Sequence, residues 1–225
     1  MTDNSKKLEL IQSLFAINGF DCPFDSARTL LRFSEILEVW NEKVNLTAHR
    51  TLDDIVLKDF IDATYFDMYR ITYRNDSSET IDLACGAGFI GITVSILHPE
   101  ASVTFLDSNR KRISFVRKVI SELGLKNASV EWGRGEEVKP HLSERFDAVV
   151  SRASFDLARF EELANQYVQN SAHAFFMGGS DKGYASSHGK SGLIEVKSEE
   201  YVLKPAGYRR KIVIFKKGAP ETGST

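Results

Sequence analysis

The first third of the chain carries the hydrophobic spacing of amphipathic helices. Apolar residues recur at helical intervals over residues 8–17 and again over 30–40, as they do on the buried face of a helix. A third helix is expected after Thr51, where two aspartates in the first turn complement the positive end of the helix dipole. The polar run 74–78 then ends the helical region.

The spacing changes near residue 79, after which short apolar strands alternate with helices. Strands are predicted at Thr80–Ala84, Ser102–Asp107, Ala128–Trp132, Phe146–Val150 and Ala172–Met177. Helices are predicted at 89–97, 109–123 and 157–169. This alternation indicates right-handed crossovers and a parallel sheet covered by helices on both faces. The last two predicted strands, Leu193–Leu203 and Tyr208–Phe215, form an antiparallel hairpin.

These elements predict an α/β protein in two parts. Residues 1–79 form an N-terminal helical extension, and residues 80–225 form a Rossmann-like domain with a mostly parallel seven-stranded sheet. The chain has 225 residues, of which 42% are hydrophobic and 27% charged. That composition is typical of a soluble globular protein and excludes a disordered, collagenous or coiled-coil chain.

Targeting and metal-binding signals are missing from the sequence. It shows no signal peptide and no apolar run long enough to cross a membrane, so we expect a cytoplasmic protein without a membrane partner. Cys22 and Cys85 are the two cysteines, and no Cys/His cluster has the spacing of zinc ligands. We therefore expect no metal, and a monomer is the simplest state for a chain that can bury its own core.

Positive charge is concentrated in the second part of the chain. Residues 1–79 hold 14 acids and 9 bases, a net charge of −5, whereas residues 80–225 hold 17 acids and 20 bases, a net charge of +3. Seven bases lie between Arg110 and Arg134 against two acids, and six lie between Lys204 and Lys217 with no acid. Such clusters suit a phosphate backbone, although a solvated helix face and a charged sheet edge would look the same.

The main chemical signal follows the first predicted strand. Gly86, Gly88 and Gly91 match the pattern G-x-G-x-x-G and open a helix. Asp82 lies in the strand before this loop, and Asp107 ends the next strand. A buried carboxylate at Asp82 would repel a pyrophosphate but suits a ligand that carries an ammonium and a sulfonium. A carboxylate at Asp107 can accept hydrogen bonds from ribose hydroxyls. The pattern predicts an S-adenosylmethionine pocket, with a nicotinamide-dinucleotide oxidoreductase as the alternative.

Two further motifs are more specific than the glycine loop. Trp40-Asn41 is followed by Asn45-Leu46-Thr47, and Ser151-Arg152-Ala153 follows a predicted strand. With these motifs the chain resembles the bacterial small-subunit rRNA guanine-N7 methyltransferases, also known as glucose-inhibited division protein B, from about residue 33 to residue 215. The resemblance implies a class I S-adenosylmethionine-dependent methyltransferase fold. It also implies S-adenosylmethionine as the cofactor and 16S rRNA of the small ribosomal subunit as the partner.

The resemblance assigns roles to individual residues. Lys111, Arg134 and Arg152 occupy positions with substrate or catalytic roles. Cofactor contacts fall on Ala84, Gly86, Gly88, Phe89, Gly135, Glu136 and Arg152, to which the strand pattern adds Asp82 and Asp107.

The chain departs from the family pattern at several positions. Ala84 stands where the family has Gly, and Ile90 where it has Pro. Asp59 replaces a histidine, and Gly178-Gly179 replaces Lys-Gly. These changes leave a second alternative open, which is an RNA-binding or assembly protein on a methyltransferase fold with changed or lost activity.

The expected reaction needs little acid–base chemistry. Guanine N7 carries a lone pair and no proton, so it can attack a sulfonium methyl without a general base. Alignment of the reacting atoms can contribute roughly 7–11 kcal/mol. We expect Lys111, Arg134 and Arg152 to bind phosphate and guanine O6. Trp40 and Trp132 are expected in the core.

Overall fold

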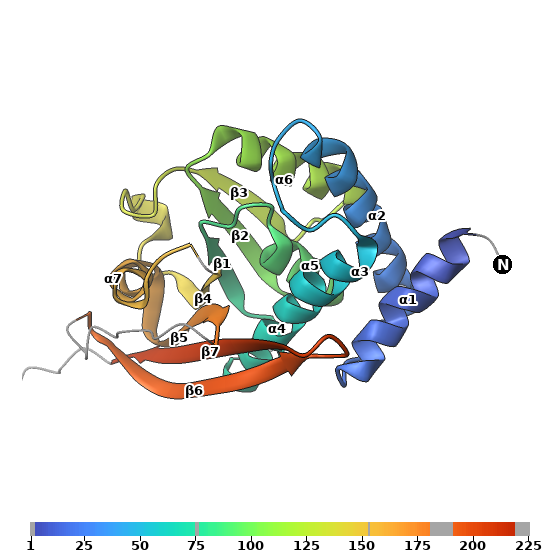
Figure 1. Cartoon of the computed structure of the whole chain (residues 1–225). Coiled ribbons are helices and arrows are strands. Elements are labelled where there is room, and N and C mark those ends of the chain that lie inside the picture. Colours follow the sequence, from blue (N-terminus) through green and yellow to red (C-terminus); the bar gives the residue numbers. More distant parts are fainter. Residues whose placement is uncertain (1–2, 75–76, 153, 181–190, 219–225) are drawn as a thin grey trace, which may run out of the picture.

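A seven-stranded sheet forms the centre of the molecule (Figure 1). The computed structural model describes residues 3–74, 77–152, 154–180 and 191–218. The strand order is β3-β2-β1-β4-β5-β7-β6. The strands are β1 (Glu79–Leu83), β2 (Ser102–Asp107), β3 (Ala128–Trp132), β4 (Phe146–Arg152), β5 (Val168–Gly179), β6 (Leu193–Leu203) and β7 (Tyr208–Lys217). β1 to β5 are parallel, and β7 runs antiparallel to β5 and β6. The predicted mostly parallel sheet with a C-terminal hairpin is confirmed.

Helices cover both faces of the sheet. One face carries α1 (Asp3–Ile17), α2 (Phe24–Asn41), α3 (Leu52–Ile55), α4 (Asp62–Tyr73), α5 (Phe89–Leu97) and α6 (Arg110–Leu123). The other face carries α7 (Leu157–Tyr167). A π-helical turn, η1 (Val56–Ile61), joins α3 to α4, and a 3-10 turn, η2 (Pro140–Leu142), precedes β4. None of the described helices has the length and apolar character of a membrane span.

The crossover helices change from one face of the sheet to the other between β1 and β4. The crossovers from β1 to β2 and from β2 to β3 use one face of the sheet, whereas the crossover from β4 to β5 uses the opposite face. The order in which successive strands are added to the sheet therefore reverses between β1 and β4. In open α/β sheets, ligands bind in the crevice outside the carboxyl ends of the two strands at such a switch point.

The N-terminal helices share a hydrophobic core with the sheet. The ring of Phe33 in α2 lies 5.6 Å from those of Phe60 in η1 and Phe89 in α5, and 6.3 Å from that of Phe115 in α6. All four side chains are buried. The cluster holds η1 and the start of α5 in fixed positions. The division of the chain at residues 79 and 80 into two parts stays a prediction.

Several elements differ from their predicted bounds, and three of these differences have a cause in the backbone. β1 ends at Leu83 because Ala84 has a φ of 53°, a left-handed conformation that cannot continue a strand. α7 ends at Tyr167, and the extended backbone of Val168 begins β5 earlier than predicted. The single helix predicted after Thr51 is α3, η1 and α4 in succession, because η1 widens the helix to a π turn.

Candidate active site at the switch point

The loop after β1 has an open side and a closed side. Ala84, Gly86 and Gly88 have φ values of 53°, 60° and 74°. A Cβ added at Gly86 would meet nothing within 4 Å, whereas one at Gly88 would lie 3.1 Å from both Ile92 and Val116. The loop is therefore open to a ligand at Gly86 and packed against the core at Gly88.

Asp82 is a buried carboxylate beneath this loop. Its Oδ2 accepts a hydrogen bond of 3.2 Å from the amide of Gly91, and the residue is 2% exposed. Burial raises the pKa of Asp82 to about 7, although the Gly91 amide and the Arg152 charge oppose the shift. Burial, with Asp82 and Asp107 nearby, also raises the pKa of the Cys85 thiol well above its usual range. Cys85 therefore stays protonated at neutral pH and is no nucleophile.

Asp107 ties the end of β2 to the glycine loop. Its Oδ2 accepts from the amide of Gly86 at 2.9 Å and its Oδ1 from the amide of Asn109 at 2.8 Å, while Arg112 lies 3.6 Å away. The carbonyl of Asp107 accepts from the amide of Gly133 at 3.2 Å. Because an ionised carboxylate offers about four lone-pair positions, Asp107 keeps acceptor capacity for a ligand.

Two cavities open at the carboxyl edge, and Asp107 contacts a lining residue of each. The first cavity, of about 260 Å³, lies at the switch point. It is lined by Asp82, Ala84, Gly86, Phe89 and Arg152 among the predicted residues, and by Leu46, Thr47, Ala48, His49, Asp59, Cys85, Ala87, Ile90, Arg112 and Ser154 in addition. The second cavity, of about 990 Å³, lies beyond β2 and is lined by Ser108, Trp132, Gly133, Arg134, Glu136, Glu137, Val138, Lys139 and Pro140.

Most of the predicted site residues therefore line the first or the second cavity, and a few line neither. Arg134 and Glu136 line the second cavity, and Glu136 pairs with Arg159 at 2.9 Å. The carbonyl of Gly135 accepts a hydrogen bond of 2.8 Å from the hydroxyl of Tyr167. Lys111 is exposed in the first turn of α6 and is not a lining residue of either cavity.

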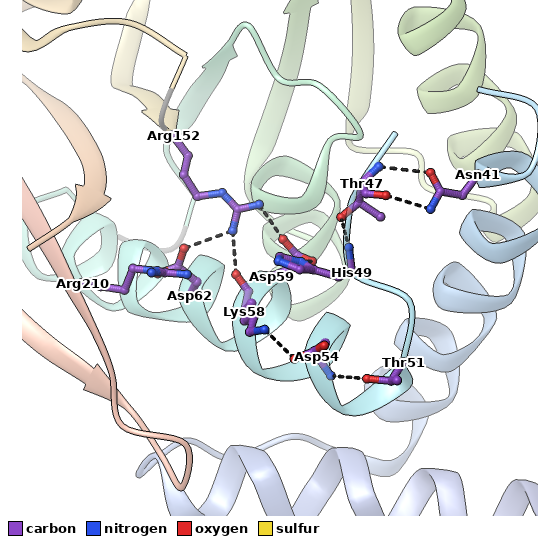
Figure 2. Close-up of polar contacts among 10 residues, drawn as sticks. All are labelled: Asn41, Thr47, His49, Thr51, Asp54, Lys58, Asp59, Asp62, Arg152 and Arg210. Atoms are coloured by element: carbon purple, nitrogen blue, oxygen red, sulfur yellow. Dashed lines mark hydrogen bonds and ion pairs between the residues drawn. The ribbon is translucent and has the colours of Figure 1, made fainter. Parts of the chain in front are cut away.

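Arg152, at the end of β4, is held by η1 and the start of α4. Its Nη2 donates to Asp59 at 2.7 Å, and its Nη1 donates to Asp62 at 3.0 Å and to the carbonyl of Lys58 at 2.9 Å (Figure 2). Burial opposes the positive charge, but the two carboxylates outweigh it and raise the pKa of Arg152 above its usual value. These contacts use three of the five N–H groups of the guanidinium.

Two residues that frame the first cavity were not predicted. Oδ1 of Asn41 accepts from the amides of Leu46 and Thr47 at 2.8 and 3.1 Å, and its Nδ2 donates to the carbonyl of Thr47 at 2.9 Å. Nδ1 of His49 lies 2.7 Å from Oδ2 of Asp59 (Figure 2). Asn41 stood in a motif that the sequence singles out, whereas no sequence signal pairs His49 with Asp59.

Trp132 is not the core residue that was predicted. Its side chain is 44% exposed because β3 is the edge strand of the sheet. The indole Nε1 donates to the carbonyl of Ser108 at 3.0 Å, and the guanidinium of Arg110 lies 4.2 Å from the ring centre. Trp40, by contrast, packs against Phe115 with 5.7 Å between ring centres.

Comparisons with known proteins agree with this geometry. The family model of rRNA small subunit methyltransferase G matches residues 26–207. A ribosomal RNA small subunit methyltransferase G of Clostridium novyi is 34% identical over 170 residues, which cover 74% of this chain and 69% of the relative. That of Clostridium tetani is 32% identical over 203 residues, which cover 84% of each chain.

Solved structures share the fold at low sequence identity. A SAM-dependent methyltransferase from Aquifex aeolicus has a TM-score of 0.57 and 16% identity, covering 82% of this chain and 97% of the other. A magnesium protoporphyrin IX methyltransferase from Synechocystis, solved with bound SAM, has a TM-score of 0.59 and 9% identity, covering 83% and 97%. At these identities the likeness concerns the fold, and it confirms the predicted class I methyltransferase architecture.

The matched span includes the residues that frame the first cavity. It contains the Asn41 motif, the glycine loop and the Ser151-Arg152 end of β4, whose third motif residue, Ala153, lies outside the described residues. The predicted resemblance and the predicted methyltransferase class are confirmed. The chain belongs to the rRNA small subunit methyltransferase G family.

Proposed function

We propose that this protein transfers a methyl group from S-adenosylmethionine to N7 of a guanine in the 16S rRNA of the bacterial small ribosomal subunit. One observation carries the proposal beyond family membership. The buried carboxylate of Asp82 and the open turn at Gly86 line the same cavity at the switch point of the sheet.

The residues at the switch point fit the cofactor, which when bound supplies an electrophilic methyl group on a sulfonium. A buried carboxylate with a pKa near neutrality favours a cationic ligand, because a nearby positive charge stabilises its ionised form. Asp107 has acceptor capacity left for ribose hydroxyls, and the second cavity beside it can receive the adenine end. The proposed cofactor-binding residues are Asp82, Ala84, Gly86, Gly88, Phe89, Asp107, Gly135, Glu136 and Arg152.

Arg152 is suited to hold the target base. Its guanidinium is fixed by Asp59, Asp62 and the carbonyl of Lys58, and it retains two N–H groups that these contacts do not use. A donor that is already fixed needs no reorganisation when a ligand arrives. Guanine O6 lies beside N7 on the same base edge, so a hydrogen bond to O6 would orient N7 without occupying it.

The carboxyl edge also carries bases that suit an RNA backbone. Lys111 begins α6 at this edge, and Arg134 lines the second cavity. On the far side of the site, Lys211 of β7 pairs in register with Gly178 at the end of β5. We assign these side chains to phosphate contacts. We also place the protein in the cytoplasm, with its ribosomal substrate, and expect it to act as a monomer.

Methyl transfer to small subunits from a strain that lacks this methyltransferase tests the proposal. With S-adenosylmethionine labelled in the methyl group, we expect label in 16S rRNA, and digestion should recover it as 7-methylguanosine. Label on another atom, or none, would overturn the proposed reaction. Calorimetry separates the alternatives: binding of a nicotinamide dinucleotide in place of S-adenosylmethionine would indicate an oxidoreductase, and RNA binding without transfer would indicate an assembly protein.

A further inference from the structure

We infer that His49 is a specificity residue that accepts a hydrogen bond from the 2-amino group of the target guanine, and that Asp59 is its positioning residue. The inference rests on the proposed transfer to guanine N7 and describes how the same site recognises the base. The two side chains form a pair in which Nδ1 of His49 and Oδ2 of Asp59 are 2.7 Å apart.

Hydrogen bonds fix the loop that carries His49, which forms part of the wall of the first cavity. Asn41 forms three hydrogen bonds with the backbone of Leu46 and Thr47. Figure 2 shows those to Thr47, together with the hydrogen bond of 3.1 Å that the amide of His49 donates to Oγ1 of Thr47. His49 lines the cavity together with Asp82, and its side chain is 28% exposed. The imidazole is therefore held in place and open to a ligand.

Asp59 fixes which ring nitrogen faces that ligand. Its side chain is 2% exposed and bridges two partners, with Oδ1 accepting from Arg152 at 2.7 Å and Oδ2 lying against Nδ1 of His49. A carboxylate accepts hydrogen bonds, so we assign the proton to Nδ1, and this tautomer has its lone pair on Nε2. Within the part of the chain that the structure describes, Nε2 has no hydrogen-bond partner, which leaves it free to accept from a base.

The pair of Arg152 and His49 complements guanine and opposes adenine. Guanine presents an acceptor at O6 and donors at N1 and at the 2-amino group, whereas adenine presents a donor at position 6 and has no 2-amino group. The Asp59 carboxylate stands between Arg152 and His49, so the donor and the acceptor are spaced apart. That spacing favours O6 and the 2-amino group, which lie at the two ends of the edge, over O6 and the adjacent N1–H.

The same contact would be stronger in the transition state than in the ground state. Attack by N7 leaves positive charge on the purine, which makes its N–H groups better donors. An imidazole backed by the buried carboxylate of Asp59 would then accept a strengthening hydrogen bond as the methyl group moves. The contact should therefore affect kcat as well as KM.

Inosine in place of the target guanine tests the contact directly, because inosine keeps N7, O6 and N1–H and lacks the 2-amino group. The substrates are small subunits reconstituted with guanine or inosine at the methylated position. For the wild-type protein we expect kcat/KM to be about tenfold lower with inosine. In His49→Asn, an amide can replace Nδ1 as the donor to Asp59, but no atom replaces Nε2. We expect this variant to use both substrates with similar kcat/KM. The ratio of kcat/KM for guanine to that for inosine is compared between wild type and variant, because any intrinsic difference in reactivity between the two bases affects both ratios equally.

Controls separate recognition from structure. His98→Asn is matched, because Nε2 of His98 also lies 2.7 Å from a buried aspartate, Asp67, at the end of α5 away from the site. It should discriminate against inosine as the wild type does. His49→Asn should keep wild-type affinity for S-adenosylmethionine by calorimetry, and its loss would indicate a structural role and overturn the inference.

The failures of the two proposals can be told apart. A wild-type protein that does not methylate guanine N7 contradicts the proposed function. A wild-type protein that methylates guanine and inosine equally well contradicts the role of His49, whether or not the variant folds. Equal discrimination by His49→Asn and the wild type would also contradict it.

Discussion

Ala84 adopts a left-handed backbone conformation in the turn between β1 and the glycine loop. A side chain with a Cβ is strained there, by about 1–2 kcal/mol, because the Cβ approaches the neighbouring carbonyl oxygen. Its carbonyl accepts a hydrogen bond of 3.2 Å from Ser154, so the loop after β4 depends on the same conformation. The turn is thus retained although alanine is not the residue that best suits it.

Ala84→Gly should stabilise the protein. Relief of the strain outweighs the greater backbone freedom that glycine brings to the unfolded chain, so the free energy of unfolding should rise by roughly 0.5–1 kcal/mol. Urea unfolding measures the change. Ala87→Gly is the matched control, because Ala87 is buried in the same loop without a positive φ. This variant should have a free energy of unfolding about 1 kcal/mol lower than the wild type. A lower midpoint for Ala84→Gly would contradict the assignment of strain.

Asp82 should make cofactor binding depend on pH. Its pKa of about 7 lies above the ordinary value of 3.8, chiefly because of burial. A cation bound nearby favours the ionised carboxylate, so binding should release a proton and tighten as the pH rises from 6 to 8. Calorimetry in buffers of different ionisation enthalpy measures the released proton, and Asp82→Asn should abolish the release. Proton release that is the same in both proteins would assign it to another group.

The same shift fixes the sign of a stability effect. Because the folded-state pKa of Asp82 lies above the unfolded value, the folded chain binds more protons between about pH 4 and pH 7. The contribution of Asp82 to the free energy of unfolding therefore falls as the pH rises through that window. Asp82→Asn should remove this part of the pH dependence.

At the scale of elements, α5 lies unusually close to β2 at Gly91. A Cβ there would come within 2.4 Å of the Phe105 ring and 2.9 Å of Val103, both on β2. Gly91→Ala should therefore push α5 away and lower the free energy of unfolding by about 1–3 kcal/mol. Gly86→Ala is the contrasting variant, because its Cβ would meet open space. It should lose less stability, about 1 kcal/mol from its positive φ, and bind S-adenosylmethionine more weakly.

Thermal unfolding and calorimetry on both glycine variants separate the two roles. The expected pattern is a lower melting temperature for Gly91→Ala, and weaker cofactor binding as the main defect of Gly86→Ala. The reverse pattern would show that the loop holds no ligand at Gly86 and that α5 can move away from β2 without loss.

The regular elements were predictable because local pattern determines them. β2, α5, β3 and β6 have their predicted bounds, where apolar periodicity meets a glycine, proline or polar stop. The π turn η1 was not predictable, because one extra residue in a continuous apolar stripe leaves the helical spacing nearly unchanged. The pairing of Arg152 with Asp59 joins residues 93 positions apart, and it depends on tertiary packing that no local pattern records.

At the scale of the whole molecule, the carboxyl edge of the sheet has buried negative side chains in the middle and positive side chains around them. The carboxylates of Asp59, Asp82 and Asp107 are buried at the base of the site. Lys111 is exposed at the start of α6 on one side, and Lys211 lies on β7 on the other. A negative interior suits a cationic methyl donor, and a positive rim suits the phosphates around the base. The proposed function requires two oppositely charged ligands at one edge, and this separation of charge would let each bind without excluding the other.

The rim lysines should control RNA affinity and its salt dependence without altering the cofactor site. Each lysine that neutralises a phosphate releases counterions, so Lys111→Ala and Lys211→Ala should each flatten the plot of log affinity against log salt by about one unit. Filter binding to 16S rRNA between low and physiological salt measures the slopes. Lys126→Ala is the matched control, because Lys126 is exposed in the turn before β3, at the opposite edge of the sheet. S-adenosylmethionine affinity should be unchanged in all three variants. Equal slopes for Lys126→Ala and the rim variants would mean that RNA does not approach through the carboxyl edge, and the base could then not reach Arg152.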